Sequence, residues 1–156
     1  MAADAVDAAV AAAGIEAPAS CTERIPLVGA PGYEGLRNRR RQLADDAGLP
    51  LGDVERLLGR YGNEVHRLLD LVADDPALAE PLPGTARVLA VEARYAATHE
   101  GALHLDDLLT RRTRLSIESV DRGVAAAPVV ARLVADDLGW DEATIEREVD
   151  SYRRRV

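Results

Sequence analysis

The chain has 156 residues, a length that suggests one domain and leaves no room for both a cofactor-binding domain and a separate catalytic domain. Its one cysteine, Cys21, excludes an internal disulfide and a CxxC zinc site and is typical of a reducing compartment. All 19 basic residues are arginine, which excludes P-loop and Schiff-base lysine chemistry, and the net charge of −8 argues against general affinity for nucleic acids or anionic membranes.

The N-terminal segment predicts a helix and then a connector. Residues 2–13 are rich in alanine, which favours a helix, and Gly14 is a good helix terminator. The helix carries Asp4 and Asp7 and has no basic leading region, so it resembles neither a signal peptide nor a membrane span, and we expect a cytoplasmic protein. Residues 15–35 are dense in proline and glycine, which predicts an extended connector.

The next segments show helical periodicity. Residues 36–48 predict one helix of about three turns that stops at its terminal glycine. Apolar residues then recur at helical spacing and predict two amphipathic helices: Val54, Leu57, Leu58 and Tyr61, followed by Val65, Leu68, Leu69 and Val72. We expect Gly62 to end the first of these helices and Asn63 to cap the second. Residues 74–84 predict a proline-punctuated loop.

Helical periodicity continues in the second half. Residues 86–100 predict a helix, and a further buried face follows at Leu105, Leu108 and Leu109. Residues 117–138 predict another helix, in which Pro128 must begin a new helix or introduce a kink. Asp141 is a candidate N-cap for a last helix with the inward residues Ile145, Val149 and Tyr152. The sequence shows no alternating strand pattern and no internal repeat.

These elements predict an all-α fold, a compact bundle of about six to eight short helices with an extended N-terminal connector. Aromatic residues make up only 3% of the chain and phenylalanine is absent, so Leu, Val and Ala must build the core. We divide the chain into residues 1–35, the N-terminal helix and connector, and residues 36–156, the helical domain.

Three features invite a chemical interpretation. His99 and His104 flank a sequence that looks like a zinc-hydrolase helix, but their five-residue spacing places them about 140° apart around a helix, so ordinary helix-end histidines are favoured. Cys21 has no neighbouring histidine or second thiol, which favours an inert side chain. The connector glycines have a GxxGxxG spacing unlike that of dinucleotide-binding loops: Gly29, Gly32 and Gly35.

Three arginine clusters are candidates for binding phosphate: Arg37 with Arg39, Arg40 and Arg41; Arg111, Arg112 and Arg114; and Arg153, Arg154 and Arg155. The favoured interpretation is solvated helix faces. For the middle cluster, we expect ion pairing between Arg94, Arg111 and Arg112 and the nearby acids Glu92, Glu100, Asp106 and Asp107. We assign no catalytic, cofactor-binding or metal-binding residue to this sequence.

A family resemblance is carried most strongly by residues 91–115, VEARYAATHEGALHLDDLLTRRTRL. This stretch resembles the signature of the C-terminal domain of aerobic, FAD-dependent glycerol-3-phosphate dehydrogenases. Further matches lie in order on both sides: TERIPLVGAPGY at 22–33, RYGNEV at 60–65, DDPALAEPLPG at 74–84 and AAAPVVARLVADDLGWDEATIEREVDSYR at 125–153.

The resemblance implies an all-α cap that follows the flavin-binding and substrate-binding parts of a larger enzyme. That parent enzyme oxidises glycerol 3-phosphate to dihydroxyacetone phosphate with quinone as acceptor, and is peripheral on the inner face of the membrane. The resemblance implies FAD in the parent and no cofactor in this chain, which should be inactive alone. The implied partner is the flavin and substrate domain, with residues 1–35 as its tail.

Homo-oligomerisation is a further possibility, whereas nucleic-acid binding and direct membrane insertion are not expected. Two alternatives remain open at this point. One is a stand-alone arginine-rich helical module that binds anions or nucleic acid, and the other is a small hydrolase that uses the His99 region.

Overall fold

The computed structural model describes residues 2–156. Over this range the chain forms ten α-helices, three 3₁₀ turns and one π-helix, and its only β-type pairing is an isolated bridge between Pro81 and Leu89. The predicted all-α class is therefore confirmed. The helices outnumber the six to eight expected because several predicted helices are broken into shorter ones.

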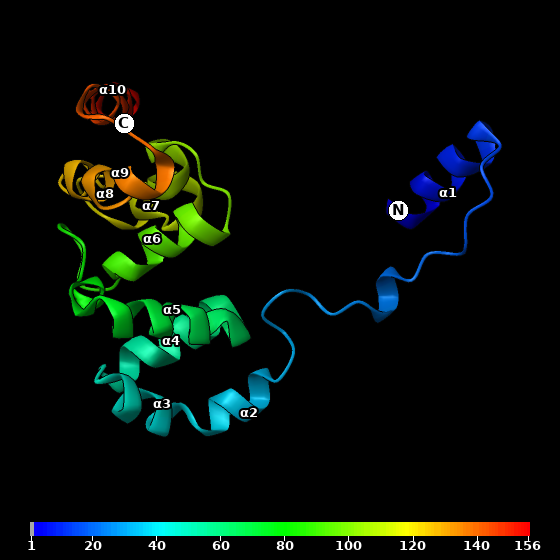
Figure 1. The fold of residues 1–156 in the computed structure, drawn as a ribbon, viewed down its shortest axis with the longest axis horizontal. Helices are drawn as coiled ribbons and strands as arrows, with labels where there is room; N and C mark the ends of the chain where they lie inside the picture. Colours follow the sequence, from blue (N-terminus) through cyan, green and yellow to red (C-terminus); the bar gives the residue numbers. More distant parts are fainter. Residues whose placement is uncertain (1) are drawn as a thin grey trace.

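The N-terminal arm, defined as residues 2–32, extends away from the helical body (Figure 1). Helix α1 (Ala2–Ala13) ends at Gly14, which has φ +65°, and none of its residues is buried. The connector contains one 3₁₀ turn, η1 (Thr22–Arg24), that the sequence did not predict. The helical body then begins with α2 (Tyr33–Asn38), inside the segment expected to be extended.

The first half of the body contains α2 and three further helices: α3 (Arg40–Ala47), α4 (Leu51–Tyr61) and α5 (Val65–Asp74). The single helix predicted over 36–48 is wrong, because Arg39 leaves the helical conformation at φ −98° and ψ 12° and divides it. Gly48 ends α3 as expected, with φ +65°. The two predicted amphipathic helices are α4 and α5, and all their predicted inward residues except the half-buried Leu69 are buried.

The predicted cap at Asn63 is wrong. A 3₁₀ turn, η2 (Gly62–Glu64), joins α4 to α5, and the cap position of α5 has no side-chain hydrogen bond. The backbone N–H of Asn63 instead donates to the Gly29 carbonyl at 2.8 Å, which fixes the connector to this corner. Gly29 has φ +88°, and a Cβ there would lie 2.7 Å from the Tyr61 carbonyl oxygen, so the close approach requires glycine.

The second half of the body follows the 3₁₀ turn η3 (Pro76–Ala79) and contains α6 (Ala90–His99), the π-helix η4 (Asp107–Arg112), α7 (Leu115–Glu118), α8 (Ala127–Leu133), α9 (Ala135–Leu138) and α10 (Glu142–Arg155). Helix α6 starts four residues later than predicted, because the Leu89 N–H is capped by the side chain of Glu92 at 2.9 Å. Of the helical segment predicted over 117–138, residues 120–126 form turns, and of the two outcomes left open at Pro128 the structure shows a new helix. The chain turns after α7, and Pro128 lies in the first turn of the new helix α8.

Two local predictions in this half concern helix ends and helix type. Asp141 caps α10 as expected, since its carboxylate accepts from the Thr144 N–H at 2.8 Å. The buried face at 105–109 belongs to a π-helix, which the periodicity did not predict. Both the N–H and the hydroxyl of Thr113 donate to the Leu108 carbonyl, at 2.8 and 2.7 Å, and this five-residue spacing is that of a π-turn.

The core consists of two hydrophobic clusters that meet at α6. Val91 and Tyr95 of α6 pack with the first half of the body, together with Val54, Leu57, Leu58, Val65 and Leu68. Ala93 and Ala96 of the same helix pack with the second half, together with Leu105, Leu108, Leu109, Leu115, Val130, Val134, Ile145, Val149 and Tyr152. Helix α6 is therefore covered on two sides. Between residues 2 and 156, none of the helices combines the length and apolarity that a bilayer span needs.

Candidate functional site

Glu92, fully buried on α6, is the centre of the polar network that joins the two halves of the body. The Arg56 guanidinium on α4 donates to its two carboxylate oxygens at 2.9 and 2.7 Å, and the Tyr61 hydroxyl donates at 3.2 Å. Burial alone would lower the pKa of Arg56, but the hydrogen bond and charge of Glu92 outweigh it and raise that pKa. Burial, and then the Glu92 charge, raise the pKa of Tyr61.

This network is suited to holding helices together. Each oxygen of Glu92 accepts from at least two donors, because the Leu89 N–H shares Oε1 with Arg56. A carboxylate saturated in this way has no free lone pair directed at a substrate. Arg60 lies farther off, with its Nε 3.8 Å from Glu92 Oε2.

The expected ion pairs of the middle arginine cluster are only partly confirmed. Arg111 pairs with Asp106 and Asp107 as expected, at 2.8 and 2.5 Å. Arg112 donates instead to the backbone carbonyl of Glu100 at 2.7 Å. Two further predicted members have partners elsewhere: Arg94 with Asp137 at 3.2 Å, and Glu92 with Arg56. Arg56 and Glu92 are 36 residues apart, so no local spacing in the sequence could have revealed this pair.

The two candidate histidines contact different partners. His99 is the last residue of α6, and its ring stacks on that of Tyr95 with the ring centroids 4.8 Å apart. Its Nδ1 also forms a hydrogen bond of 2.7 Å with the hydroxyl of Thr98. His104 Nδ1 lies 3.0 Å from Glu148 Oε1 on α10, and this hydrogen bond, with the carboxylate charge, raises the pKa of His104. Cys21 is exposed in the connector. Across residues 2–156, no three His, Cys, Asp or Glu side chains are grouped to hold a metal ion.

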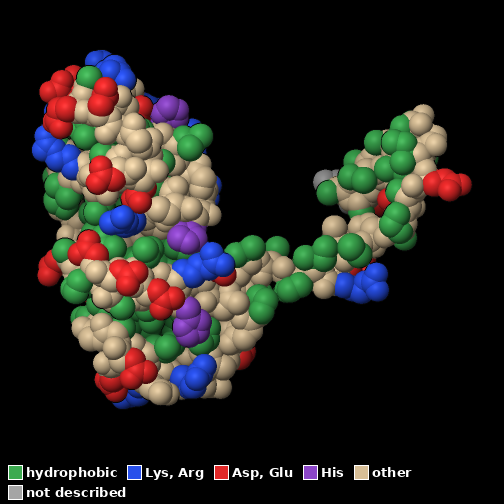
Figure 2. All heavy atoms as spheres, viewed as in Figure 1, with side chains coloured by type: hydrophobic (Ala, Val, Ile, Leu, Met, Phe, Trp, Pro, Cys, Tyr) green, Lys and Arg blue, Asp and Glu red, His purple; other side chains and the backbone are tan. Residues whose placement is uncertain are grey.

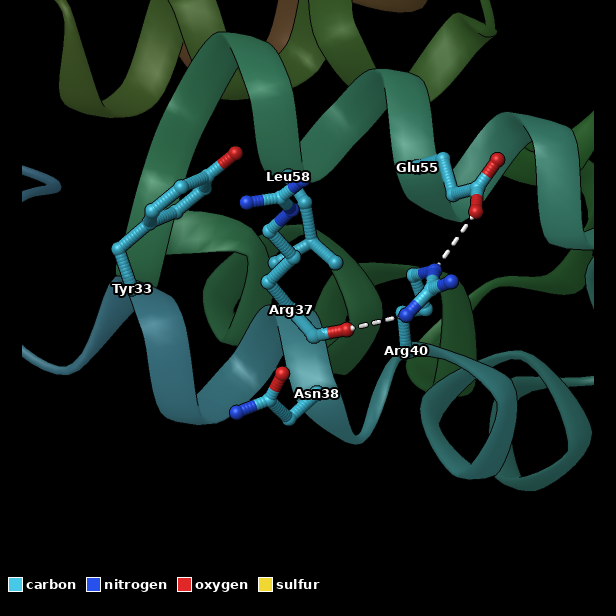
Figure 3. Close-up of a pocket in the computed structure, with 6 residues that line it drawn as sticks. All are labelled: Tyr33, Arg37, Asn38, Arg40, Glu55 and Leu58. Carbon is cyan, nitrogen blue, oxygen red and sulfur yellow. Dashed lines mark hydrogen bonds and ion pairs between the residues drawn. The ribbon is translucent and has the colours of Figure 1, made fainter.

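Two arginines of the first cluster, Arg37 and Arg40, line a cleft of about 460 Å³ between α2, α3 and α4 (Figure 3). Arg40 reaches from α3 to Glu55 on α4 at 2.7 Å and also donates to the Arg37 carbonyl at 2.9 Å. Arg37 itself lies 3.7 Å from Glu34. Arg155, from the third cluster, pairs with Asp106 at 2.9 Å. The Arg37 pair lies within α2, whereas the contacts of Arg40 and Arg155 connect neighbouring elements of the chain.

The connector glycines do not form a dinucleotide-binding loop. Gly32 has φ +73° and precedes α2, a helix of six residues, and no strand leads into it anywhere in the described part of the chain. A flavin pyrophosphate site of the usual kind needs a strand, a glycine-rich turn and a helix N-terminus. The described residues therefore do not form a flavin pyrophosphate site of this kind.

The N-terminal arm carries an apolar groove of about 860 Å³, and hydrophobic side chains follow the arm in Figure 2. The residues that line the groove include Val6 and Val10 of α1 and Ile15, which lies two residues beyond the end of that helix. Farther along the connector, Leu27 is 83% exposed and Val28 is 87% exposed. Apolar side chains concentrated on an extended segment are typical of a surface that another part of a protein covers.

The fold and these contacts define an all-α domain. Residues 20–145 of this chain match the family described as the C-terminal domain of alpha-glycerophosphate oxidase. The chain belongs to this family. It is 49% identical over all its 156 residues to glycerol-3-phosphate dehydrogenase of Mycobacterium leprae (strain TN), and 47% identical to glycerol-3-phosphate dehydrogenase 2 of Mycobacterium tuberculosis (strain ATCC 25618 / H37Rv).

More distant similarity extends to the mitochondrial glycerol-3-phosphate dehydrogenase of Bos taurus, which is 27% identical over 158 residues, covering 99% of this chain and 21% of that protein. The chain spans 27% of the length of the two mycobacterial relatives and matches their C-terminal part. No solved structure matches it. The alternative of a stand-alone arginine-rich module is not supported.

Proposed function

We propose that this chain acts as the helical cap of an FAD-dependent glycerol-3-phosphate dehydrogenase and has no catalytic activity alone. The match to the C-terminal part of named dehydrogenases carries the proposal. The proposed parent reaction is oxidation of glycerol 3-phosphate to dihydroxyacetone phosphate, with electrons passing to quinone. Flavin and substrate would be held by the upstream part of the parent, because the described residues of this chain form no flavin pyrophosphate site of the usual kind.

The proposed partner of the cap is that upstream part, and the N-terminal arm is the proposed contact. Residues 1–35, of which residue 1 lies outside the described residues, would belong to the tail of the upstream domain, and residues 36–156 would form the cap. Helix α1 has no buried residue, although Val6 and Ile15 are apolar and about 60% exposed. Burying such side chains against the upstream domain would stabilise the assembly through the hydrophobic effect.

We further propose a cytoplasmic location, with the parent enzyme peripheral on the inner face of the membrane. Self-association of the isolated chain through the same exposed arm is part of this proposal. Sedimentation analysis of the isolated chain and of a form that lacks residues 2–20 tests it. We expect only the full chain to associate.

Calorimetric titration of the 156-residue chain into the separately produced upstream part tests the main proposal, with dye reduction by glycerol 3-phosphate as a second readout. We expect binding that V6D combined with L27D weakens at least about tenfold, since each change places a charge in a buried apolar contact. The matched control is L103D, because Leu103 is a 65% exposed residue of the body. Absence of association, or a chain that binds FAD or oxidises glycerol 3-phosphate unaided, would contradict the proposal.

A further inference from the structure

A second cleft, of about 570 Å³, opens between α4 and the loop that precedes α6. Arg56 and Arg60 of α4 and Arg87 of the loop lie in its walls, together with Thr85 and Glu118. None of these arginines belongs to the three clusters along the sequence. The fold alone brings them together, from positions up to 31 residues apart (87 − 56).

Arg56 and Arg60 share one carboxylate beneath this cleft, that of Glu92. Arg56 makes both of its short contacts to Glu92, at 2.9 and 2.7 Å. The Nε of Arg60 is 3.8 Å from the same carboxylate, which already accepts from Arg56, a tyrosine hydroxyl and a backbone N–H. Arg60 also lies over the Tyr61 ring at 5.7 Å, a contact that leaves its N–H donors available.

Arg87 is not neutralised by any described residue. Its backbone N–H donates to Thr85, but its guanidinium has no ion pair or hydrogen bond within residues 2–156. Glu118, at the edge of the cleft, lies 3.8 Å from Arg114, which shares its charge. Five arginines elsewhere in the body have close carboxylate partners, namely Arg40, Arg94, Arg111, Arg132 and Arg155, whereas others, such as the exposed Arg39 and Arg41, have no ion pair among the described residues and line no common cleft with Arg87. The cleft therefore concentrates positive charge in a chain whose net charge is −8.

Two further donors in the cleft lack an acceptor. The Nε of Arg56 is buried and has no hydrogen-bond partner among the described residues. The Thr85 hydroxyl accepts from the Arg87 N–H at 3.0 Å, which leaves its own proton to donate. The Arg56 Nε is buried, so the donors that face an oxyanion in the cleft are the Thr85 hydroxyl and the guanidinium groups of Arg60 and Arg87.

We propose that this cleft binds a phosphate monoester, with Arg60 and Arg87 holding the phosphate oxygens and Thr85 donating its hydroxyl proton. Guanidinium groups match phosphate oxygens in geometry, and because Arg56, Arg60 and Arg87 have only the buried carboxylate of Glu92 as a close partner, the excess positive charge favours a dianion over a singly charged carboxylate. A volume of about 570 Å³ admits a small phosphorylated metabolite. This inference concerns binding by the cap itself and does not depend on docking to the upstream part.

Titration of the full 156-residue chain with inorganic phosphate at pH 7.5 and constant ionic strength tests the proposal. Backbone N–H signals of Thr85 and Arg87 and the side-chain Nε–H signal of Arg60 are followed by NMR. We expect saturable shifts at these positions. R87Q and R60Q should each weaken phosphate binding about tenfold, because each removes a charge-assisted contact.

R39Q is the matched control, because Arg39 is an exposed arginine that does not line the cleft and the variant loses the same charge. Thermal unfolding of each variant establishes that it is folded, and Arg87 lies in an exposed loop whose substitution should leave the fold intact. The proposal is overturned if phosphate produces no saturable shift, if R87Q binds phosphate as tightly as R39Q, or if acetate binds as tightly as phosphate.

Discussion

The guanidinium of Arg56 donates two parallel hydrogen bonds to the carboxylate of Glu92, and this pair connects α4 to α6 across the meeting point of the two core clusters. The Glu92 side chain is fully buried and that of Arg56 is 19% exposed, so solvent screens their attraction only weakly. The same carboxylate caps the N-terminus of α6. One acidic side chain thus fixes both where α6 begins and which helix it packs against.

Replacing Glu92 by glutamine should lower the free energy of unfolding by about 3–5 kcal/mol, because it leaves the charge of Arg56 without a partner in a mostly buried position. Urea denaturation monitored by circular dichroism measures this loss. E118Q is the control, since Glu118 is exposed and its 3.8 Å pair should contribute less than about 1 kcal/mol. A loss for E92Q no larger than that of E118Q would show that the pair is unimportant for stability.

His104 should make stability depend on pH. Glu148 raises the pKa of His104 in the folded chain, so the contribution of their contact is fully present below the unfolded-state pKa of about 6.5. It is lost as pH rises through the raised folded-state pKa. Asp106 and Asp107 act in the same direction, whereas slight burial opposes the shift.

The difference in unfolding free energy between the parent chain and H104Q should therefore be largest near pH 5.5 and small by pH 8.5. Denaturant titrations at a series of pH values measure it. H66Q is the matched control, because it removes another exposed histidine, on α5. A difference for H104Q that grows with pH would reverse the expected sign.

Gly29 should hold the arm on the body. In G29A, the new methyl group would meet the Tyr61 carbonyl, and the positive φ would be strained, so the contact between Gly29 and the Asn63 N–H should open. We expect faster hydrogen exchange at Asn63 and faster proteolysis of the connector, with the body still folded. G35A is the control, since a Cβ at Gly35 meets no atom within 4 Å. Equal exchange rates in the two variants would exclude this anchoring role.

Arg114 adopts a left-handed conformation with φ +62°, which costs a residue with a side chain about 1 kcal/mol. R114G should therefore be about 1 kcal/mol more stable than R114A, although both lose the same exposed contact to Glu118. Parallel thermal and urea unfolding of the two variants compares them. If R114A equals or exceeds R114G in stability, the left-handed backbone at this position is not a source of strain.

The sequence predicted the local structure correctly where residues close together in the chain determine it. Most inward residues of α4 and α5, the Gly48 stop and the Asp141 cap followed from periodicity, glycine conformation and capping chemistry, and a break at Pro128 followed from its missing N–H. The resemblance at residues 91–115 also indicated the family that the comparisons show.

The sequence was uninformative wherever contacts between distant segments decide the local structure. Asn63 does not cap α5 but lies inside a 3₁₀ turn, where its backbone N–H donates to Gly29, 34 residues away (63 − 29), and its side-chain oxygen has no hydrogen-bond partner among the described residues. The late start of α6 reflects capping by Glu92, which in turn is held by Arg56. The cleft of Arg60 and Arg87 was missed for the same reason, since neither residue is part of a charged run.

Helix α6 contributes side chains to both hydrophobic clusters, so neither half of the body can open without removing α6 from the other. The body should therefore unfold as one cooperative unit, and its slowest-exchanging amides in α4, α6 and α8 should share a single opening free energy. The N-terminal arm, which shares no residue with either cluster, should exchange independently and fast.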